Sequence, residues 1–188
     1  MKNIFKIAAQ WFSVVVMLPF AILCAFGRIS VLFTIFAHIC AQIPGILGDY
    51  ARTAFYWMTL RECAIDARIS FGTFFAHREV SVESKVYIGS YCILGRTRIG
   101  ARTQVASHVQ ILSGRRQHSR DEAGKISGVD QDALVEVAIG ADCWIGAGAI
   151  VMADIGEGTT IGAGAIVTNP IPAGSVAVGN PARVKRQL

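Results

Sequence analysis

Four histidines are the side chains of this 188-residue chain best suited to proton transfer near neutral pH. An imidazole titrates at about pH 6.5, so it can act as a general base on a hydroxyl or an amine. His38 lies in an apolar stretch, where a structural role is expected, and His77 lies in an irregular region. His108 and His118 are ten residues apart, without the close histidine pair expected of a zinc site. The spacing of the histidines therefore favours a role in acid–base catalysis over zinc binding, and no metal is expected.

The cysteines offer no second kind of chemistry. There are five, an odd number, with no CxxC pair, so we expect reduced thiols rather than disulfides. Three of them recur at repeat positions and are not expected to act as covalent nucleophiles. The five are Cys24, Cys40, Cys63, Cys92 and Cys143.

The overall composition excludes some classes of protein. Only 16% of the residues are charged and 53% are hydrophobic, which argues against disorder and for a membrane contact or an extensive core. The formal net charge of +5 is spread along the chain rather than gathered in one run. No nucleic-acid partner is therefore expected, and anionic headgroups or phosphorylated cofactors are favoured.

Residues 1–50 are predicted to form an apolar α-helical hairpin that associates with a membrane. Between Lys6 and Arg28 there are 21 uncharged residues, and between Arg28 and Asp49 another 20, each about the length of a membrane-spanning helix. Pro19 and Pro44 fall inside these stretches and favour a kinked hairpin that is interfacial or re-entrant, with two full crossings still open. A cleaved secretory signal, or helices buried in a soluble oligomer, are the alternatives. Residues 51–61 are expected to form a junction that caps the first coil of the domain at residues 62–188.

From about Cys63 the apolar residues recur every six positions. Each unit can supply one short strand and one corner, and three units close one triangular coil, so we expect roughly five stacked coils. The period is interrupted between Ile88 and Ile93, between Val151 and Ile155, and by a long polar loop at residues 113–136. The series that carry the period are Ile93, Ile99, Val105 and Ile111; Ile139, Ile145 and Val151; and Ile155, Ile161 and Val167.

The run CWIGAGAIVMADIGEGTTIGAGAIVTNPIPAGSVAVGNPARVKR resembles the C-terminal half of the hexapeptide-repeat acyltransferases. That family includes the maltose, galactoside, serine and streptogramin acetyltransferases and many polysaccharide O-acetyltransferases. The resemblance covers about residues 62–188, and its most specific part is the motif from Val178 to Arg183. It implies a mainly β fold, a left-handed parallel β-helix, and homotrimers with active sites between neighbouring subunits.

The resemblance also implies that acetyl-CoA or another acyl-CoA binds in a groove along the coils. Small side chains would keep the groove wall low, so that the pantetheine arm can reach the backbone, and arginines would pair with phosphates. A corner aromatic at a subunit interface and a solvated basic tail are the alternative roles. The matching positions are Trp144, Ala147, Ala163, Thr168, Asn169, Arg183 and Arg186.

His118 stands at the root of the 113–136 loop, where the family's catalytic histidine also resides, so the resemblance implies that it is the general base. His108 is the reserve candidate. The acceptor for the second imidazole nitrogen is left open between Asp121, Glu122 and Glu136. Some relatives place an asparagine from an earlier coil near the acceptor. This chain has only Asn3, Asn169 and Asn180, so its acceptor pocket is expected to differ.

The expected function is therefore a CoA-dependent acyltransferase. It would move an acetyl group from acetyl-CoA to a hydroxyl of a sugar, a lipid-linked sugar or a polysaccharide precursor, with amine acceptors left open. The hairpin would hold it at the cytoplasmic face of a membrane, the bacterial inner membrane, where the acyl donor is available. A non-catalytic trimeric membrane scaffold and a γ-type carbonic anhydrase are the rival functions.

Overall fold

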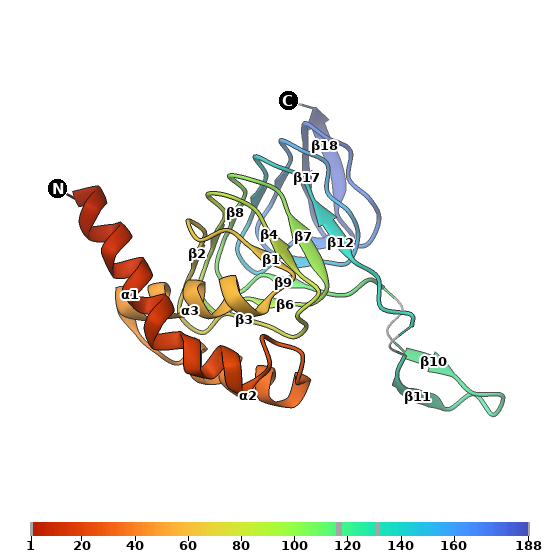
Figure 1. The fold of residues 1–188 in the computed structure, drawn as a ribbon. Helices are drawn as coiled ribbons and strands as arrows, with labels where there is room; N and C mark the ends of the chain where they lie inside the picture. Colours follow the sequence, from red (N-terminus) through yellow and green to blue (C-terminus); the bar gives the residue numbers. More distant parts are fainter. Residues whose placement is uncertain (1, 116–117, 131, 188) are drawn as a thin grey trace.

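Three helices precede the β-structure in the computed structural model (Figure 1): α1 (Lys2–Leu23), α2 (Ser30–Ala41) and α3 (Gly45–Thr59). The structure describes residues 2–115, 118–130 and 132–187, with side chains from Lys6 onward. Residue 1 of the 1–50 segment, residue 188, and residues 116, 117 and 131 of the 113–136 loop lie outside the described residues.

The predicted parallel β-helix is confirmed, and its strands form three walls. Wall A contains β1 (Glu62–Cys63), β4 (Ser81–Val82), β7 (Thr97–Ile99) and β12 (Val137–Ile139). Wall B contains β2 (Arg68–Ile69), β5 (Tyr87–Ile88), β8 (Gln104–Val105), β13 (Trp144–Ile145), β15 (Thr160–Ile161), β17 (Ser175–Val178) and β18 (Arg183–Gln187). Wall C contains β3 (Phe74–Phe75), β6 (Ile93–Leu94), β9 (Gln110–Ile111), β14 (Ile150–Val151) and β16 (Ile166–Val167).

The coils stack in parallel until the last strand. Among the described residues, four coils place a strand in every wall, and a fifth enters wall A through an isolated bridge at Ile155. A sixth is begun by Ile171 and β17, and β18 then folds back antiparallel on β17. Roughly five coils were expected, and the additional partial coil covers the end of the stack.

The core is the column of residues that point into the stack, and it corrects one part of the predicted period. Leu94 is fully buried and pairs with Ile111, whereas Ile93 is 40% exposed. The step from Ile88 to Leu94 is therefore a regular six, and the short step falls between Leu94 and Ile99. Strand alternation explains the error, because of two adjacent apolar residues only one can face inward.

All departures from the six-residue step occur at one corner, where the chain leaves wall C for wall A. We call this the C–A corner. Successive inward residues there are Phe75 and Val82, Leu94 and Ile99, Val151 and Ile155, and Val167 and Ile171. The 113–136 loop leaves the stack at the same corner, between β9 and β12.

Glycines after the inward aliphatic residues have a steric reason at two clear positions. A Cβ at Gly146 would lie 2.5 Å from the backbone nitrogen of Ala163, and one at Gly100 would lie 2.4 Å from that of Ala141. The next coil therefore leaves no room for a side chain.

The N-terminal region differs from the predicted two-helix hairpin. Helix α3 runs across the expected boundary at residue 50, so that most of the 51–61 junction is helical. Pro44 does not kink a second long helix but precedes α3 as its N-cap, a position that suits a residue without an N–H. Tyr56 on α3 is buried with its ring 4.7 Å from that of Phe75 in the first coil. Helix α3 thus covers the open edge of the stack.

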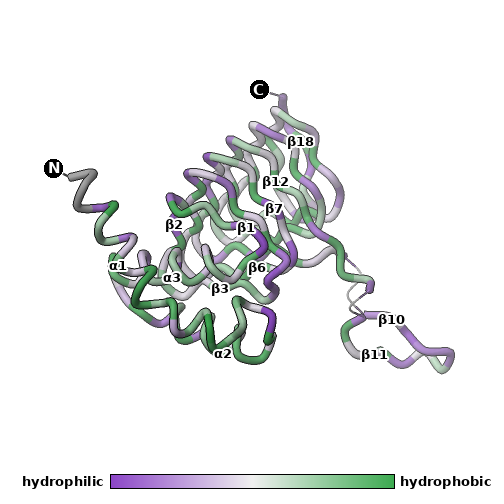
Figure 2. Tube along the Cα trace, in the orientation of Figure 1, coloured by the Kyte–Doolittle hydropathy of each residue, from purple (hydrophilic) through white to green (hydrophobic). Residues whose placement is uncertain are grey.

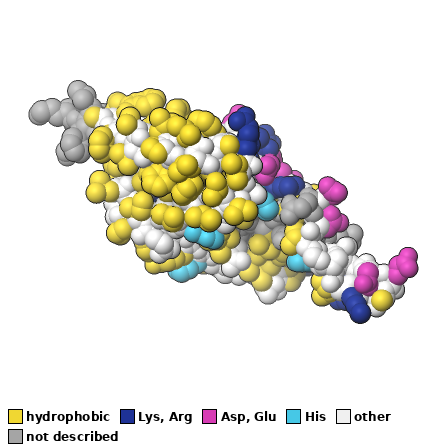
Figure 3. Space-filling model, turned by 60° about the horizontal axis from the view of Figure 1, so that its bottom comes forward, with side chains coloured by type: hydrophobic (Ala, Val, Ile, Leu, Met, Phe, Trp, Pro, Cys, Tyr) yellow, Lys and Arg dark blue, Asp and Glu magenta, His cyan; other side chains and the backbone are white. Residues whose placement is uncertain are grey.

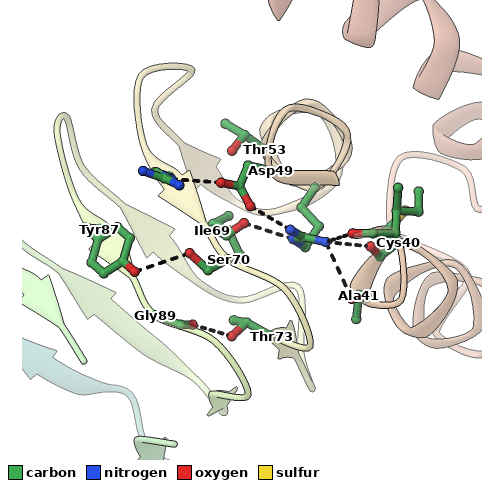
Figure 4. A network of polar contacts seen from close by, with 12 residues as sticks. Cys40, Ala41, Asp49, Thr53, Ile69, Ser70, Thr73, Tyr87 and Gly89 are labelled. Atoms are coloured by element: carbon green, nitrogen blue, oxygen red, sulfur yellow. Dashed lines mark hydrogen bonds and ion pairs between the residues drawn. The ribbon is translucent and has the colours of Figure 1, made fainter. Parts of the chain in front are cut away.

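A buried arginine joins the helices to the first coil (Figure 4). Arg52 on α3 is fully buried, and its guanidinium donates to the Asp49 carboxylate at 2.8 Å. It also donates to backbone carbonyls of α2, of the α2–α3 link and of β2, namely Cys40 at 3.1 Å, Ile43 at 2.7 Å and Ile69 at 2.9 Å. One side chain therefore fixes α2, the α2–α3 link, α3 and β2 relative to one another.

The side of the helices turned away from the stack is apolar. Figure 2 shows hydrophobic residues along α1 and α2, and Figure 3 shows their side chains gathered on one face with charged side chains at its border. One described helix segment, Lys6–Leu23, is long and apolar enough to cross a membrane by length and composition. We call this surface the apolar helix face; its exposed large side chains are Ile7, Trp11, Phe12, Val15, Val16, Leu18, Ile22, Leu23, Phe26, Ile29, Val31, Ile35, Ile39, Ile46 and Leu47.

Candidate active site

Trp144 lies on the outer surface of wall B and is 59% exposed. It occupies the outward position of β13, and its strand neighbours are Gln104 on one side and Thr160 on the other. A large flat ring is therefore presented to solvent beside a polar ladder. This position can stack against a ligand or against another copy of the chain.

Ala147 and Ala163 stack on each other where the chain turns from wall B to wall C. The N–H of Gly164 donates to the carbonyl oxygen of Ala147 at 2.8 Å, which holds the two corners in register. Gly148 and Gly164 have φ values of +69° and +67°, and nothing lies within 4 Å of a Cβ built on either. The corner is consequently a low wall on which an extended chain can approach the backbone.

Thr168 and Asn169 lie at the C–A corner, after β16. The Asn169 side-chain amide donates to the Thr168 hydroxyl at 3.4 Å, and its Oδ1 accepts a hydrogen bond from Arg115 at 3.2 Å. Arg115 belongs to the root of the 113–136 loop, and sequence reasoning did not single it out. This contact joins the loop root to the corner predicted to bind the cofactor.

Arg183 and Arg186 lie on the terminal strand β18 and are exposed. They pair in register with Val178 and Val176 of β17, and one Arg183 nitrogen donates to the carbonyl oxygen of Ala182 at 3.1 Å. Both guanidinium groups therefore stand at the last coil with capacity left for phosphate oxygens.

His118 lies on a two-stranded arm that leaves the stack (Figure 1). The arm is the antiparallel pair β10 (His118–Arg120) and β11 (Ile126–Val129), and it projects away from the β-helix. His118 is exposed, and its Nδ1 lies 3.2 Å from the carbonyl oxygen of Ser127. Since a carbonyl oxygen only accepts, a hydrogen bond here requires the proton on Nδ1 and leaves the Nε2 lone pair available as a base.

The three candidate orienting carboxylates lie beside other groups. Asp121 accepts from the backbone N–H of Lys125 in the turn of the arm at 2.9 Å. Glu136 forms an ion pair with Arg61, and Glu122 is exposed beside Asp121. The partner of His118 is instead the Ser127 backbone, which carries no side-chain signature in the sequence.

The remaining histidines lie on the body of the molecule. His108 occupies a corner with φ of +61°, and its ring stacks on that of Tyr91 with centroids 5.3 Å apart. The His38 ring meets Phe74 edge to face at 4.5 Å. His77 lies beside the turn that joins α1 to α2. Among the described residues, no three His, Cys, Asp or Glu side chains gather as a metal site.

The thiols are buried, as expected for repeat positions. Burial raises the pKa of Cys63 to about 12. Burial also raises the pKa values of Cys92 and Cys143 above the ordinary range. These thiols are held protonated and inside the stack, which opposes a role as nucleophile.

No protein-family model matches the sequence, and no curated protein sequence matches it. Solved structures share its fold. The N-acyltransferase AntD from Bacillus cereus, in complex with dTDP and 3-hydroxybutyryl-CoA, is 19% identical, with a TM-score of 0.52 over 64% of this chain and 69% of that chain. A point mutant of AntD, with dTDP and coenzyme A, is 19% identical, with a TM-score of 0.54 over 65% and 70%. The polysialic acid O-acetyltransferase OatWY is 16% identical, with a TM-score of 0.50 over 65% and 61%.

These similarities define the class of fold. The chain has the parallel β-helix that is shared by AntD and OatWY, the architecture of the hexapeptide-repeat acyltransferases. The shared region corresponds to about two thirds of the chain.

Proposed function

We propose that this protein is a CoA-dependent acyltransferase that moves an acetyl group to a hydroxyl of a sugar, a lipid-linked sugar or a polysaccharide precursor. The observation that carries the proposal is the contact between His118 Nδ1 and the Ser127 carbonyl, which fixes the imidazole with a basic nitrogen exposed. The structures of AntD with coenzyme A or an acyl-CoA, and OatWY as an O-acetyltransferase, support this class of chemistry for the fold.

His118 would act as the general base. Its Nε2 takes the proton of the acceptor hydroxyl as the oxygen attacks the thioester carbonyl. Backbone N–H groups stabilise the oxyanion of the tetrahedral intermediate. Collapse of the intermediate breaks the carbon–sulfur bond, and the departing thiolate receives the proton from the imidazolium. The products are the acetyl ester and free coenzyme A.

The acyl-CoA would lie along the low wall at Ala147 and Ala163. Trp144 would flank it, Thr168 and Asn169 would bind its amide groups, and the guanidinium groups of Arg183 and Arg186 would pair with its phosphates. The arm formed by β10 and β11, which begins at His118, projects away from the stack that carries these residues (Figure 1). We infer that His118 acts in the groove of a neighbouring copy. A homotrimer, in which the arm of one copy reaches the groove of the next, completes the site.

The apolar helix face would hold the enzyme on a membrane surface, on the cytoplasmic side where acetyl-CoA is available. Helix α2 has 12 residues and is about 18 Å long, too short for a hydrocarbon core of about 30 Å. Helix α1 packs on α3, which the Arg52 contacts fix to the first coil. The three helices therefore bind the bilayer as one unit lying in its interface, with Arg28 and Lys6 at the level of the phosphates.

A thioester-release assay with acetyl-CoA and candidate sugar acceptors tests the activity. We expect His118→Ala to lower the turnover rate about 100- to 10,000-fold with unchanged CoA affinity, because general-base catalysis contributes about that much. His108→Ala is the matched control and should keep the wild-type rate. If the protein binds no CoA, the acyltransferase assignment is wrong and the non-catalytic trimeric scaffold is the remaining function. If His118→Ala keeps full activity, only the assignment of His118 as the general base is wrong.

Subunit mixing tests the shared site. Ala163→Arg should block the groove without touching the arm, so neither it nor His118→Ala is active alone. Co-expressed in one trimer, the two variants should recover part of the activity, because a wild-type arm then meets a wild-type groove. Complete inactivity of the mixed trimers would place the whole site within one copy.

A further inference from the structure

A cavity of about 230 Å³ lies where the helices meet the C–A corner. Its walls come from the α1–α2 turn and the start of α2 on one side, and from the chain between β3 and β4 and the chain after β6 on the other. We call it the junction pocket. Its lining includes Arg28, Thr34, His77, Arg78, Glu79 and Arg96.

The junction pocket is cationic. Its lining includes the three arginines Arg28, Arg78 and Arg96 and a single acidic residue, Glu79. Burial lowers the pKa of His77, and the charge of Arg96 lowers it further, while Glu79 opposes the shift. The imidazole is therefore neutral near pH 7 and able to accept or donate a hydrogen bond. A net charge of two positive units remains in the pocket.

Two of these cations are unpaired within the described part of the protein. There the side chains of Arg28 and Arg78 make no hydrogen bond or ion pair. By contrast, Arg61 forms an ion pair with Glu136, and Arg68 forms one with Asp49. Guanidinium groups lining a cavity without a carboxylate partner are suited to an anionic ligand.

The start of α2 adds to the positive electrostatic potential of the junction pocket. The helix begins at Ser30, after an N-cap residue, Ile29, that makes no side-chain capping bond. The first N–H groups of a helix and its dipole favour an anion at this end. Thr34, one turn further on, also lines the cavity, and its hydroxyl donates to the carbonyl oxygen of Ser30 at 3.0 Å.

The position of the junction pocket relates it to the proposed active site. Along the C–A corner, the N–H of Ala76 donates to Leu94, and that of Gly95 donates to Ile111 one coil further. Adjacent strands lie about 4.8 Å apart, so the lining at Ala76 is two coils, or about 10 Å, from the root of the 113–136 loop. The lining at Arg96 is only one coil away, and the backbone N–H of Arg96 donates to the Ser113 hydroxyl at 2.8 Å. On its other side it adjoins the apolar helix face, where Ile29 and Val31 are exposed. It lies between the proposed membrane surface and the loop that carries His118.

We propose that the junction pocket binds the phosphate-bearing head group of the acyl acceptor. The identification of the ligand as the acyl acceptor rests on the proposed function. The presence of a phosphate on that ligand is inferred from the junction pocket alone. The volume is below the roughly 300 Å³ at which pockets for drug-sized ligands begin, so it fits a phosphate or diphosphate with the adjoining atoms rather than a whole lipid. The rest of the acceptor would extend along the C–A corner toward the loop.

Direct binding of inorganic pyrophosphate, measured by calorimetry on the full-length protein without CoA, tests the pocket. We expect the double variant Arg28→Gln/Arg78→Gln to weaken pyrophosphate binding at least tenfold. The matched control is Arg98→Gln, an exposed arginine on the outer side of wall A, which should stay within twofold of wild type. Thermal unfolding of each variant verifies that the fold is retained. If the wild type and the double variant bind pyrophosphate equally well, the junction pocket does not bind a soluble phosphate.

Vesicles distinguish a lipid head group from a soluble phosphate. Wild-type protein should bind phosphatidylglycerol vesicles, whose head group carries a net negative charge, more tightly than zwitterionic phosphatidylcholine vesicles. If the phosphate is lipid-borne, the double variant should lose most of that difference, whereas Lys6→Gln, which removes an interfacial cation outside the junction pocket, should keep most of it. The apolar contribution is common to both vesicles and cancels in the comparison. If neither pyrophosphate nor the vesicle difference depends on Arg28 and Arg78, the proposal is wrong. The CoA affinity of the same double variant should be unchanged. Absence of CoA binding in the wild type would instead refute the acyltransferase assignment, so the two failures can be told apart.

Discussion

Replacing Arg52 by methionine should destabilise the protein severely, because the buried guanidinium satisfies several groups at once. The change removes the buried one of the two arginine partners of the Asp49 carboxylate and the donors to the carbonyls of Cys40, Ile43 and Ile69. Breaking a buried ion pair by removing one member costs about 3–5 kcal/mol. We therefore expect Arg52→Met to lower the free energy of unfolding by about 4 kcal/mol.

A second arginine on the same carboxylate provides the control. Arg68 also contacts Asp49 at 2.8 Å, but its side chain is 63% exposed whereas that of Arg52 is fully buried. Exposed pairs contribute about 0–1 kcal/mol, so Arg68→Met should change the stability by no more than about 1 kcal/mol. Both arginines lie 2.8 Å from the same carboxylate, so the two variants compare a buried guanidinium with an exposed one at the same distance.

The assay is urea unfolding followed by tryptophan fluorescence, since Trp11 and Trp57 report on the helices and Trp144 on the stack. Both regions should unfold at lower urea in Arg52→Met, because the arginine joins them. Equal losses in the two variants, or a loss below about 1 kcal/mol in Arg52→Met, would refute the argument that burial of this guanidinium couples the helices to the first coil.

Three further predictions concern the stack and the junction pocket. Gly146→Ala should cost about 3 kcal/mol in unfolding experiments, because its Cβ meets the next coil, whereas Gly128→Ala, with open space around it, should stay within about 0.5 kcal/mol. Iodoacetamide at about pH 7.5 should leave Cys63 unmodified by mass spectrometry until the protein is unfolded, because burial raises its pKa to about 12; rapid native labelling would contradict this. His77 has a lowered pKa through burial and a neighbouring arginine, so its contribution to stability is complete above the unfolded-state pKa of about 6.5 and is lost as the pH falls through the lower native value. Between about pH 7 and pH 5 the wild type should therefore lose more unfolding free energy than His77→Gln, and parallel curves would refute the role of His77.

The repeat was predictable because each six-residue unit repeats the same local constraint. An aliphatic side chain faces inward, and at positions such as Gly146 the next coil leaves no room for a Cβ. The assignment of Ile93 as a core residue was wrong because sequence spacing alone does not separate it from Leu94. The strand pairing of the folded coils decides which of the two points inward.

The helical region and the site were less predictable for a different reason. The third helix is defined by contacts of Arg52 and Tyr56 with the first coil, and such long-range contacts leave no periodic signal. The Ser127 carbonyl opposite His118 is a backbone group, invisible to residue type. The junction pocket combines Arg28 with residues of the coils that only the wound chain brings beside it. His118 and the groove residues remain predictions until they are tested.

The C–A corner has a consequence for how such a chain can diversify. Steps across the other two corners stay at six residues from coil to coil, whereas this corner accepts links of four, five or seven residues and one loop that carries an arm. Inserting residues there leaves the inward-facing pattern of every later coil unchanged, because each coil re-enters wall A in register with the one before. Related proteins could therefore differ in the loops at the C–A corner, and so in what they bind, while the stack of coils stays the same. An engineered insertion should likewise be placed at residues 152–154 rather than at either of the other corners.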